Sequence, residues 1–333
     1  MAASVRSKNG NAPSTGGPLG LVRALLRRQE ATALVVLIIM GAYLASRNPN
    51  FLTVRNFTLV GRSLSYIALA GMGVMLVISC GLIDLSVGSC MGLAGIWAAY
   101  MTVNLHAPDW MIIPSVLLVG MAFGFVNGNL ITRLDLNPFM VTLGTSFVGR
   151  GLIYVITKAW PIDGFSKSLR VLGNGFVRGI PIPVWIMLGF LIFFSWLMSA
   201  TKFGWHIYAT GGSEESARLS GIPVDRVKRI AFMVAGMMCA IGGFLLTARL
   251  GTGEVTIAQG YELDVIAATV IGGTKMGGGG RGGTAIGVFI GACVMALLRN
   301  ALTMLSISPD FQTIVIGSAM LGAMILDRMN TRR

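Results

Sequence analysis

GLIDLSVGS, residues 81–89, places one carboxylate, Asp84, between two long apolar runs. The runs, 63–80 and 85–104, each approach the roughly 20 residues that a helix needs to cross a bilayer core of about 30 Å. No Lys or Arg stands near Asp84 in the sequence. We therefore expect Gly81 to end the first helix. We expect Asp84 to cap the second, accepting backbone N–H groups at the positive end of the helix dipole.

The composition extends this pattern over the whole chain. Of its 333 residues, 54% are hydrophobic and only 12% are charged, and the apolar residues form long blocks, not the stripes of a soluble helix. The 45 glycines suit close packing between membrane helices. The net charge of +13 comes mostly from Lys and Arg at the ends of apolar blocks, which argues against a nucleic-acid surface. The sequence predicts an all-α, polytopic membrane protein.

Length and polar interruptions divide the chain into about ten membrane spans. The eighth is too short alone, and we expect it to extend into the glycine-rich segment that follows it. The expected spans are 30–46, 63–80, 85–104, 110–131, 138–157, 182–200, 229–249, 262–273, 284–300 and 311–327.

Charge sets the expected orientation. Residues 1–29 read as a flexible polar tail, and placing it in the cytoplasm puts most Lys and Arg inside. An even number of spans returns the C-terminus to the cytoplasm, so that 30–333 is one transmembrane domain with both ends inside. The largest cytoplasmic loop is then 201–228 and the largest outer loop 158–181. A cleaved signal peptide is the alternative at the N-terminus, but no A-x-A-like site follows the first apolar run.

A constant shift aligns two segments of the chain with each other. It places Gly120, Asn129, Thr132, Leu134, Pro138 and Thr142 on Gly291, Asn300, Thr303, Leu305, Pro309 and Thr313. The first copy joins the fourth and fifth spans on the inside, and the second joins the ninth and tenth on the outside. The pattern predicts an inverted five-plus-five repeat, which is common in transporters. Chance similarity between two apolar, glycine-rich segments is the alternative.

Residues that enzymes and metal sites need are scarce. The only histidines, His106 and His206, lie in loops, away from any Ser nucleophile with an acid. The glycine-rich segment 272–283 lacks GxxxxGK[ST], so we expect no ATP site, no cofactor and no enzyme activity in this chain. The cysteines show no metal-ligand spacing, and we interpret them as packing residues. They are Cys80, Cys90, Cys239 and Cys293.

Carboxylates are missing from the interiors of the expected spans, which argues against ion-coupled transport. We therefore expect an energy source outside the chain. Arg150 is the one ionisable residue set well inside a span, and we interpret it as reaching toward the outer interface. A ligand for an anionic substrate is the alternative.

The loop 201–228 contains a helix that its sequence bounds at both ends. Ser213 is a suitable N-cap, and Glu214 and Glu215 suit the first turn beside the helix dipole. Gly221 can take the left-handed conformation that ends a helix, and Pro223 follows it. The resulting rod of about 10 Å lies across the membrane surface. It is either a docking point for a partner or an ordinary surface helix.

Four stretches carry a resemblance to one family. They are GLIDLSVGS at 81–89, NPFMVTLGTSFVGRGL at 137–152, ATGGSEESARLSGIPVDRVK at 209–228 and GYELDVIAATVIGGTKMGGGGRGG at 260–283. In these, and over nearly everything after residue 50, the chain resembles the permease subunits of bacterial ATP-driven sugar importers. This ribose-type family also has permeases for xylose, arabinose, galactose and autoinducer-2.

The resemblance implies a type II ABC importer fold in the bacterial inner membrane. Two permease subunits, identical or paralogous, would form one pathway surrounded by lipid, with ATPase subunits below and a periplasmic sugar-binding protein above. The family's loop helix couples ATP hydrolysis to gating. Ser213 stands where the family usually has Asn, and Ser216 where it usually has Ala; both replacements are small. The implied coupling residues are Gly211, Gly212, Ser213, Glu214, Glu215, Ala217, Arg218, Gly221 and Ile222.

The expected function is import of a monosaccharide or related polyol. Besides the capping role of Asp84, a role in the pathway or gate is open for Asp84, Ser86, Asn137, Phe139 and Thr142. Glu262 and Asp264, at the outer end of the eighth span, are either first-turn residues or contacts of the binding protein. One alternative is an ABC permease for branched-chain amino acids or nucleosides. Another is a non-transporting membrane scaffold that docks a partner through 209–228.

Overall fold

The computed structural model of the chain describes residues 29–275, 283–308, 311–312, 314–315 and 317–318. Its helices are α2 (Gln29–Arg47), α3 (Val54–Ser79), α4 (Val87–Val103), α5 (Asp109–Arg133), α6 (Pro138–Thr157), α7 (Lys167–Asn174), α8 (Ile182–Ala200), α9 (Lys202–Gly212), α10 (Glu214–Leu219), α11 (Val224–Leu250), α12 (Tyr261–Ile271) and α13 (Ala285–Met304). Its strands are β1 (Ile162–Asp163), β2 (Phe176–Val177), β3 (Ile180–Pro181) and β4 (Thr252–Gly253). They form two antiparallel pairs, β1 with β4 and β2 with β3.

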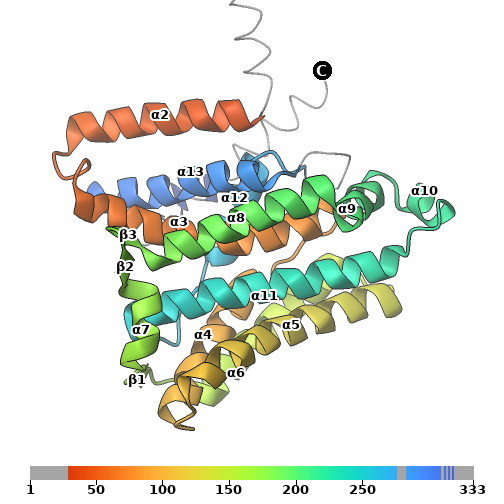
Figure 1. Cartoon of the computed structure of the whole chain (residues 1–333), viewed down its shortest axis with the longest axis horizontal. Helices are drawn as coiled ribbons and strands as arrows, with labels where there is room; N and C mark the ends of the chain where they lie inside the picture. Colours follow the sequence, from red (N-terminus) through yellow and green to blue (C-terminus); the bar gives the residue numbers. More distant parts are fainter. Residues whose placement is uncertain (1–28, 276–282, 309–310, 313, 316, 319–333) are drawn as a thin grey trace, which may run out of the picture.

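The long helices run side by side, and short elements lie at the two ends of the bundle (Figure 1). α7 lies across one end, beside the first three strands, and α10 projects from the other; these are called the α7 end and the α10 end. α11 runs between the two ends and packs against α5, α3 and α4. α2 lies on the outside of the bundle against α13.

The chain changes direction at residue 81 because a glycine ends α3. Gly81 has a φ of +83°, and the next N–H, of Leu82, donates to the Val77 carbonyl at 3.2 Å. This left-handed ending satisfies a carbonyl that has no partner within the helix. The prediction that Gly81 ends the second span is confirmed. The chain then runs without helix to Val87, where α4 begins.

Several predicted boundaries agree with the helices and others shift. α6 and α8 coincide with the expected spans 138–157 and 182–200. α3 begins well before the predicted residue 63, because Thr53 caps it by accepting the N–H of Asn56 at 3.3 Å. The loops 158–181 and 201–228 contain α7, α9 and three of the strands, which the sequence analysis did not predict.

The eighth expected span is shorter than predicted. α12 ends at Ile271, Gly273 has a φ of +95°, and residues 274–275 are not helical. The predicted extension of the helix into 272–275 is therefore wrong, because glycine destabilises a helix and the left-handed Gly273 turns the chain here. Residues 276–282, with most of the glycine run, lie outside the described residues, as does most of the tenth span.

The inverted repeat stays a prediction. Pro309 and Thr313, which belong to its second copy, lie outside the described residues. At one described pair the copies differ. Asn300 exchanges hydrogen bonds with Asn56 of α3 at 2.7 and 3.3 Å, whereas Asn129 donates to the Phe125 carbonyl of its own helix.

Within the described residues, six helices are long and apolar enough to cross a membrane: α3, α5, α6, α8, α11 and α13. In the most apolar windows of α3 and α11, 78% and 72% of the residues are buried, against 22% in α6 and in α8. Because α6 and α8 expose apolar side chains over most of their length, they suit lipid or another apolar surface. The chain is thus a multi-pass membrane protein with α3 and α11 at its centre.

Candidate functional site

The rod predicted in the loop 201–228 is α10. Ser213 caps it, accepting the N–H of Ser216 at 3.2 Å. Gly221, with a φ of +80°, ends it, and the N–H of Ile222 donates to the Ala217 carbonyl at 3.0 Å. Serine at the N-cap and a left-handed glycine after the last turn are the signals that bound a short helix. The predicted helix and both of its caps are confirmed.

The predicted coupling residues differ in their exposure to solvent. Ala217 is buried, whereas Glu215 and Leu219 are exposed and lie four residues apart, on one face of the helix. Leu219, which sequence reasoning missed, is 85% exposed. An isolated exposed Leu is common on protein surfaces, so its exposure shows only that this face of the helix is accessible. Glu215 and Leu219 are therefore called the outer face of α10.

Gly211 and Gly212 belong to α9, which precedes the rod. A Cβ on Gly211 would lie 1.8 Å from the Ser79 carbonyl oxygen at the end of α3, so only glycine fits there. Around Gly212 no atom lies within 4 Å of a Cβ position. Gly211 thus sets the approach of α9 to α3, a role that its place in a motif did not reveal.

Glu214 forms two ion pairs within the chain. Its carboxylate lies 2.6 Å from the ammonium of Lys228 and 2.9 Å from the guanidinium of Arg218. The hydrogen bond from Lys228, with a further contribution from Arg218, lowers the pKa of the Glu214 carboxyl below its usual range. Arg218 also reaches Asp225 of α11 at 2.5 Å. The spacing of Glu214 and Arg218 on one helix was a readable signal for the first pair; Lys228 and Asp225 were missed.

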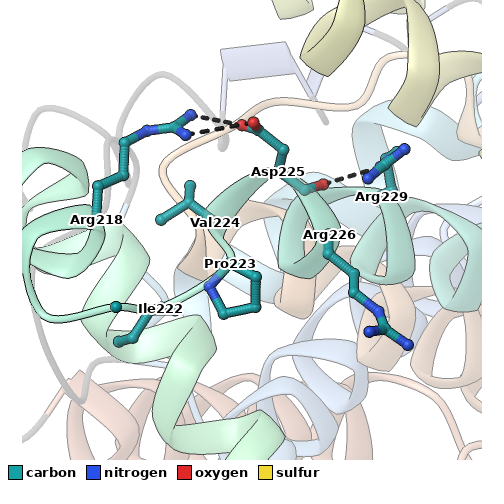
Figure 2. A pocket seen from close by; sticks show the side chains of 8 residues that line it. Arg218, Ile222, Pro223, Val224, Asp225, Arg226 and Arg229 are labelled. Atoms are coloured by element: carbon teal, nitrogen blue, oxygen red, sulfur yellow. Dashed lines mark hydrogen bonds and ion pairs between the residues drawn. The ribbon is translucent and has the colours of Figure 1, made fainter.

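A hollow of about 430 Å³ lies where α10 meets α11. Figure 2 shows Arg218 reaching across it to Asp225. Arg226 is exposed and has no side-chain partner among the described residues, and Arg229 donates to the Asp225 carbonyl at 3.2 Å. The hollow is therefore open and basic. It is lined by Arg218, Gly221, Ile222, Pro223, Val224, Asp225, Arg226 and Arg229.

Asp84 does not cap α4. The N-cap is Ser86, without a side-chain capping bond, and α4 begins at Val87. Asp84 is 4% exposed, and one of its oxygens accepts from the N–H of Ser86 at 2.8 Å and from the Ser86 hydroxyl at 2.5 Å. The predicted capping role is corrected accordingly: a short Asp side chain bonds most easily to the backbone two residues on. Here that residue lies outside the helix.

Ser86 joins this carboxylate to α5. Asn127, which is 1% exposed, donates to the Ser86 hydroxyl oxygen at 2.9 Å. Thr142 of α6, also buried, donates to the Pro138 carbonyl at 2.9 Å and approaches the Ile83 carbonyl at 3.5 Å. Three helices therefore meet at one polar cluster inside the bundle. Sequence reasoning missed Asn127, because nothing marks it within an apolar span.

Two pathway candidates stay outside this cluster. Asn137 caps α6, accepting the N–H of Phe139 at 3.0 Å, and its side chain is exposed. The Phe139 side chain is exposed as well. The structure therefore brings Asp84, Ser86 and Thr142 together, and it leaves Asn137 and Phe139 at the surface of the chain.

The candidates at the start of α12 are partly or wholly enclosed. Asp264 is fully buried, and its carboxylate lies 2.5 Å from the Arg299 guanidinium of α13. The Asp264 carboxylate therefore lies inside the chain, away from any surface that a binding protein could contact. Glu262 lies against Gly88 of α4, which has no room for a Cβ. As predicted, both residues lie in the first turn, whose N-cap is Gly260.

Arg150 reaches the loop that joins α11 to α12. Its guanidinium donates to the Ile257 carbonyl at 2.8 Å. The cysteines are free, three of them buried. No group of three or more His, Cys, Asp or Glu side chains within the described residues is arranged to hold a metal ion.

Comparison with known proteins places this geometry in context. A family model described as branched-chain amino acid transport system permease component matches residues 57–324. The ribose import permease protein of Haemophilus influenzae is 38% identical over 90% of this chain and 93% of its own. The L-arabinose transport system permease protein of Escherichia coli is 35% identical over 89% of each chain. The D-allose transport system permease protein of the same organism is 35% identical over 88% of this chain and 90% of its own.

One solved structure, of an ABC transporter of metal-chelate type in an inward-facing conformation, aligns with 90% of this chain and 98% of its own. The identity is 15% and the TM-score 0.49.

Proposed function

This chain belongs to the family of branched-chain amino acid transport system permease components, and we propose that it is the permease subunit of an ATP-binding-cassette sugar importer. It carries a neutral monosaccharide or related polyol across the bacterial inner membrane. The relatives that match nearly the whole chain are permeases for ribose, arabinose and allose. ATP is hydrolysed on separate partner subunits, so the chain itself is not an enzyme.

The relatives, and not Arg150, favour a sugar over an amino acid, because those that match nearly the whole chain are permeases for ribose, arabinose and allose. A branched-chain amino acid carries a carboxylate, for which a fixed cation inside the membrane is a natural partner. The Arg150 guanidinium donates to the neutral Ile257 carbonyl, which leaves its charge and its other N–H groups available. A neutral sugar needs hydrogen-bonding groups and no fixed charge in its pathway. The buried cluster around Asp84, Ser86 and Thr142 offers such groups where three helices meet.

The observation that carries the proposal is α10, a helix capped at both ends that projects from one end of the bundle (Figure 1). On this proposal the α10 end faces the cytoplasm, both chain termini lie there, and the ATPase docks on the outer face of α10. The α7 end then faces the periplasm and receives the sugar-binding protein. A second permease copy or a paralogue packs on the exposed apolar helices and completes the pathway.

Uptake in proteoliposomes tests the function. The vesicles contain this chain, its ATPase and the binding protein, and the radiolabelled solutes are ribose, arabinose, allose and leucine. ATP-dependent accumulation of a sugar, and not of leucine, is expected. Leucine uptake alone would favour an amino-acid permease. A complex that assembles and moves none of these solutes would favour a scaffold.

A pair of variants tests docking on the outer face of α10. Glu215→Lys and Leu219→Asp are expected to lower the amount of ATPase that co-purifies with the permease, because both side chains are exposed. Thermal unfolding of the permease alone should stay unchanged, since neither side chain is buried. Lys202→Asp, a charge reversal at the exposed start of the neighbouring helix α9, is the control. Undiminished co-purification of both variants would contradict docking there.

A further inference from the structure

Lys228 is a buried cation at the α10 end of α11. It is 8% exposed, and its ammonium lies 2.6 Å from the Glu214 carboxylate of α10. A buried ammonium is costly unless it is paired. Glu214 is its one ion-pair partner within the described part of the chain. The ion pair between Lys228 and Glu214 therefore holds the first turn of α10 against α11.

Arg218 adds a second connection between the same two helices. It lies 2.9 Å from Glu214 on its own helix and 2.5 Å from Asp225 on α11. These side chains are nearly half exposed, and such pairs contribute little stability individually. Here the pairs fix the position of α10 on α11, because Glu214 is also bonded to the buried ammonium of Lys228. The short link 220–223 also joins the two helices, and α9, which leads into α10, packs against both of them.

α11 is in turn held to the centre of the bundle by backbone contact. A Cβ on Gly124 of α5 would lie 2.0 Å from the Phe232 carbonyl oxygen of α11. A Cβ on Gly243 of α11 would lie 1.9 Å from the Met91 carbonyl oxygen of α4. Packed interiors shift as units and do not deform continuously. A displacement of α11 therefore reaches α4, which Ser86 directly precedes, and α5, which contains Asn127.

We infer that the ion pairs of Glu214 with Lys228 and of Arg218 with Asp225 tie α10 to α11, making Lys228 and Glu214 positioning residues for coupled transport. This rests on the proposed function, in which the ATPase moves α10. The tie passes that movement to α11 and the polar cluster. Glu214 is then not an ATPase contact, and that role falls to the outer face of α10.

The competing explanation is that the Lys228 pair only stabilises the fold. Removing one partner strands a buried charge, which destabilises, whereas replacing both partners by neutral side chains of similar size is often nearly neutral. The informative variants are therefore Lys228→Met alone, Glu214→Gln alone, and the two together. Lys202→Met, at an exposed position of α9, is the matched control for losing a lysine charge.

The measurement is the number of sugar molecules taken up per ATP hydrolysed, with ATPase co-purification and thermal unfolding recorded for each variant. The double variant is expected to unfold at the temperature of the parent and to bind the ATPase normally. Its uptake per ATP should still fall by about tenfold, a size typical of coupling between two sites. A double variant that recovers both stability and uptake per ATP would overturn the inference. So would loss of ATPase binding with Glu214→Gln but not with Lys228→Met.

A distance measurement separates this inference from the proposed function. Spin labels at Leu219 on α10 and at Arg133, at the end of α5, report how α10 sits on the bundle without any transport. A narrow distance distribution in the parent and a broad one in the double variant are expected. Equal distributions would overturn the tie, even if sugar uptake is intact. If the parent transports nothing while the double variant shows this broadening, the proposed function fails and the tie stands.

Discussion

Gly120 on α5 and Gly236 on α11 face each other so closely that a Cβ on Gly236 would lie 2.1 Å from the Gly120 carbonyl oxygen. A Cβ on Gly120 would lie 2.3 Å from the Gly236 carbonyl oxygen. No side chain fits such a contact, so glycine on both helices lets the backbones touch. Between membrane helices this packing replaces the hydrophobic driving force that water supplies to soluble proteins.

Gly236→Ala is therefore expected to lower the stability of the permease by about 1–3 kcal/mol, the usual cost of forcing a methyl group into a packed core. Thermal unfolding in detergent measures it. Gly144→Ala is the control, because no atom lies within 4 Å of a Cβ at Gly144. If both variants unfold at the temperature of the parent, α5 and α11 do not meet as described.

Replacing Arg299 alone should lower the stability of the protein more than neutralising Arg299 and Asp264 together. Arg299→Met leaves a fully buried carboxylate without its partner, which costs about 3–5 kcal/mol. Adding Asp264→Asn should recover most of that loss. Unfolding temperatures of the two single variants and the double variant measure the interaction. Purely additive losses would count against a direct pair.

Ser86→Ala is expected to destabilise the protein by about 1–3 kcal/mol, because both Asp84 and Asn127 would lose a buried hydrogen-bond partner. Ser89→Ala is the matched comparison. Its hydroxyl donates only to the Ser86 carbonyl, which also accepts the N–H of Cys90. Thermal unfolding of the two variants should differ clearly. Equal losses would show that the cluster does not depend on Ser86.

The attachment of α10 should depend on pH in acid. The lowered pKa of Glu214, caused first by its bond to Lys228, means that the folded form binds its proton less readily than the unfolded chain. The tie is then complete above the ordinary Glu pKa of 4.5 and is lost as pH falls through the lowered value. The distribution of distances between spin labels at Leu219 and Arg133 should broaden over that pH range. In Glu214→Gln the distribution should already be broader at neutral pH, and the change that remains in acid should come from Asp225, whose pKa is lowered by its hydrogen bond to Arg218.

Features that depend on near neighbours in the chain were predictable. Gly81, Ser213 and Gly221 act where the sequence indicated, because a cap bonds to groups within a few residues of itself. Asp84 shows where this reasoning stops. Its side chain bonds locally, as expected for Asp, but to Ser86 and not to the helix, and the start of α4 was predicted two residues too early.

Contacts between distant segments were not predictable. Asn127 reaches Ser86, and Arg299 reaches Asp264, across helices whose order along the chain gives no sign of contact. Lys228 reads in the sequence as one of several cytoplasmic charges that set topology. Only its burial beneath α10 marks it as a residue that needs Glu214.

The sequence by itself determined the membrane class, the main apolar helices and the short capped rod, because apolar length and local capping act over one helix at a time. Its family followed from motifs that a single chain displays. The tertiary structure decided which face of α10 is free, which carboxylates are buried and which glycines let backbones meet. Those features depend on the energy of enclosing a charge or a methyl group, and that energy is set by neighbours from other helices.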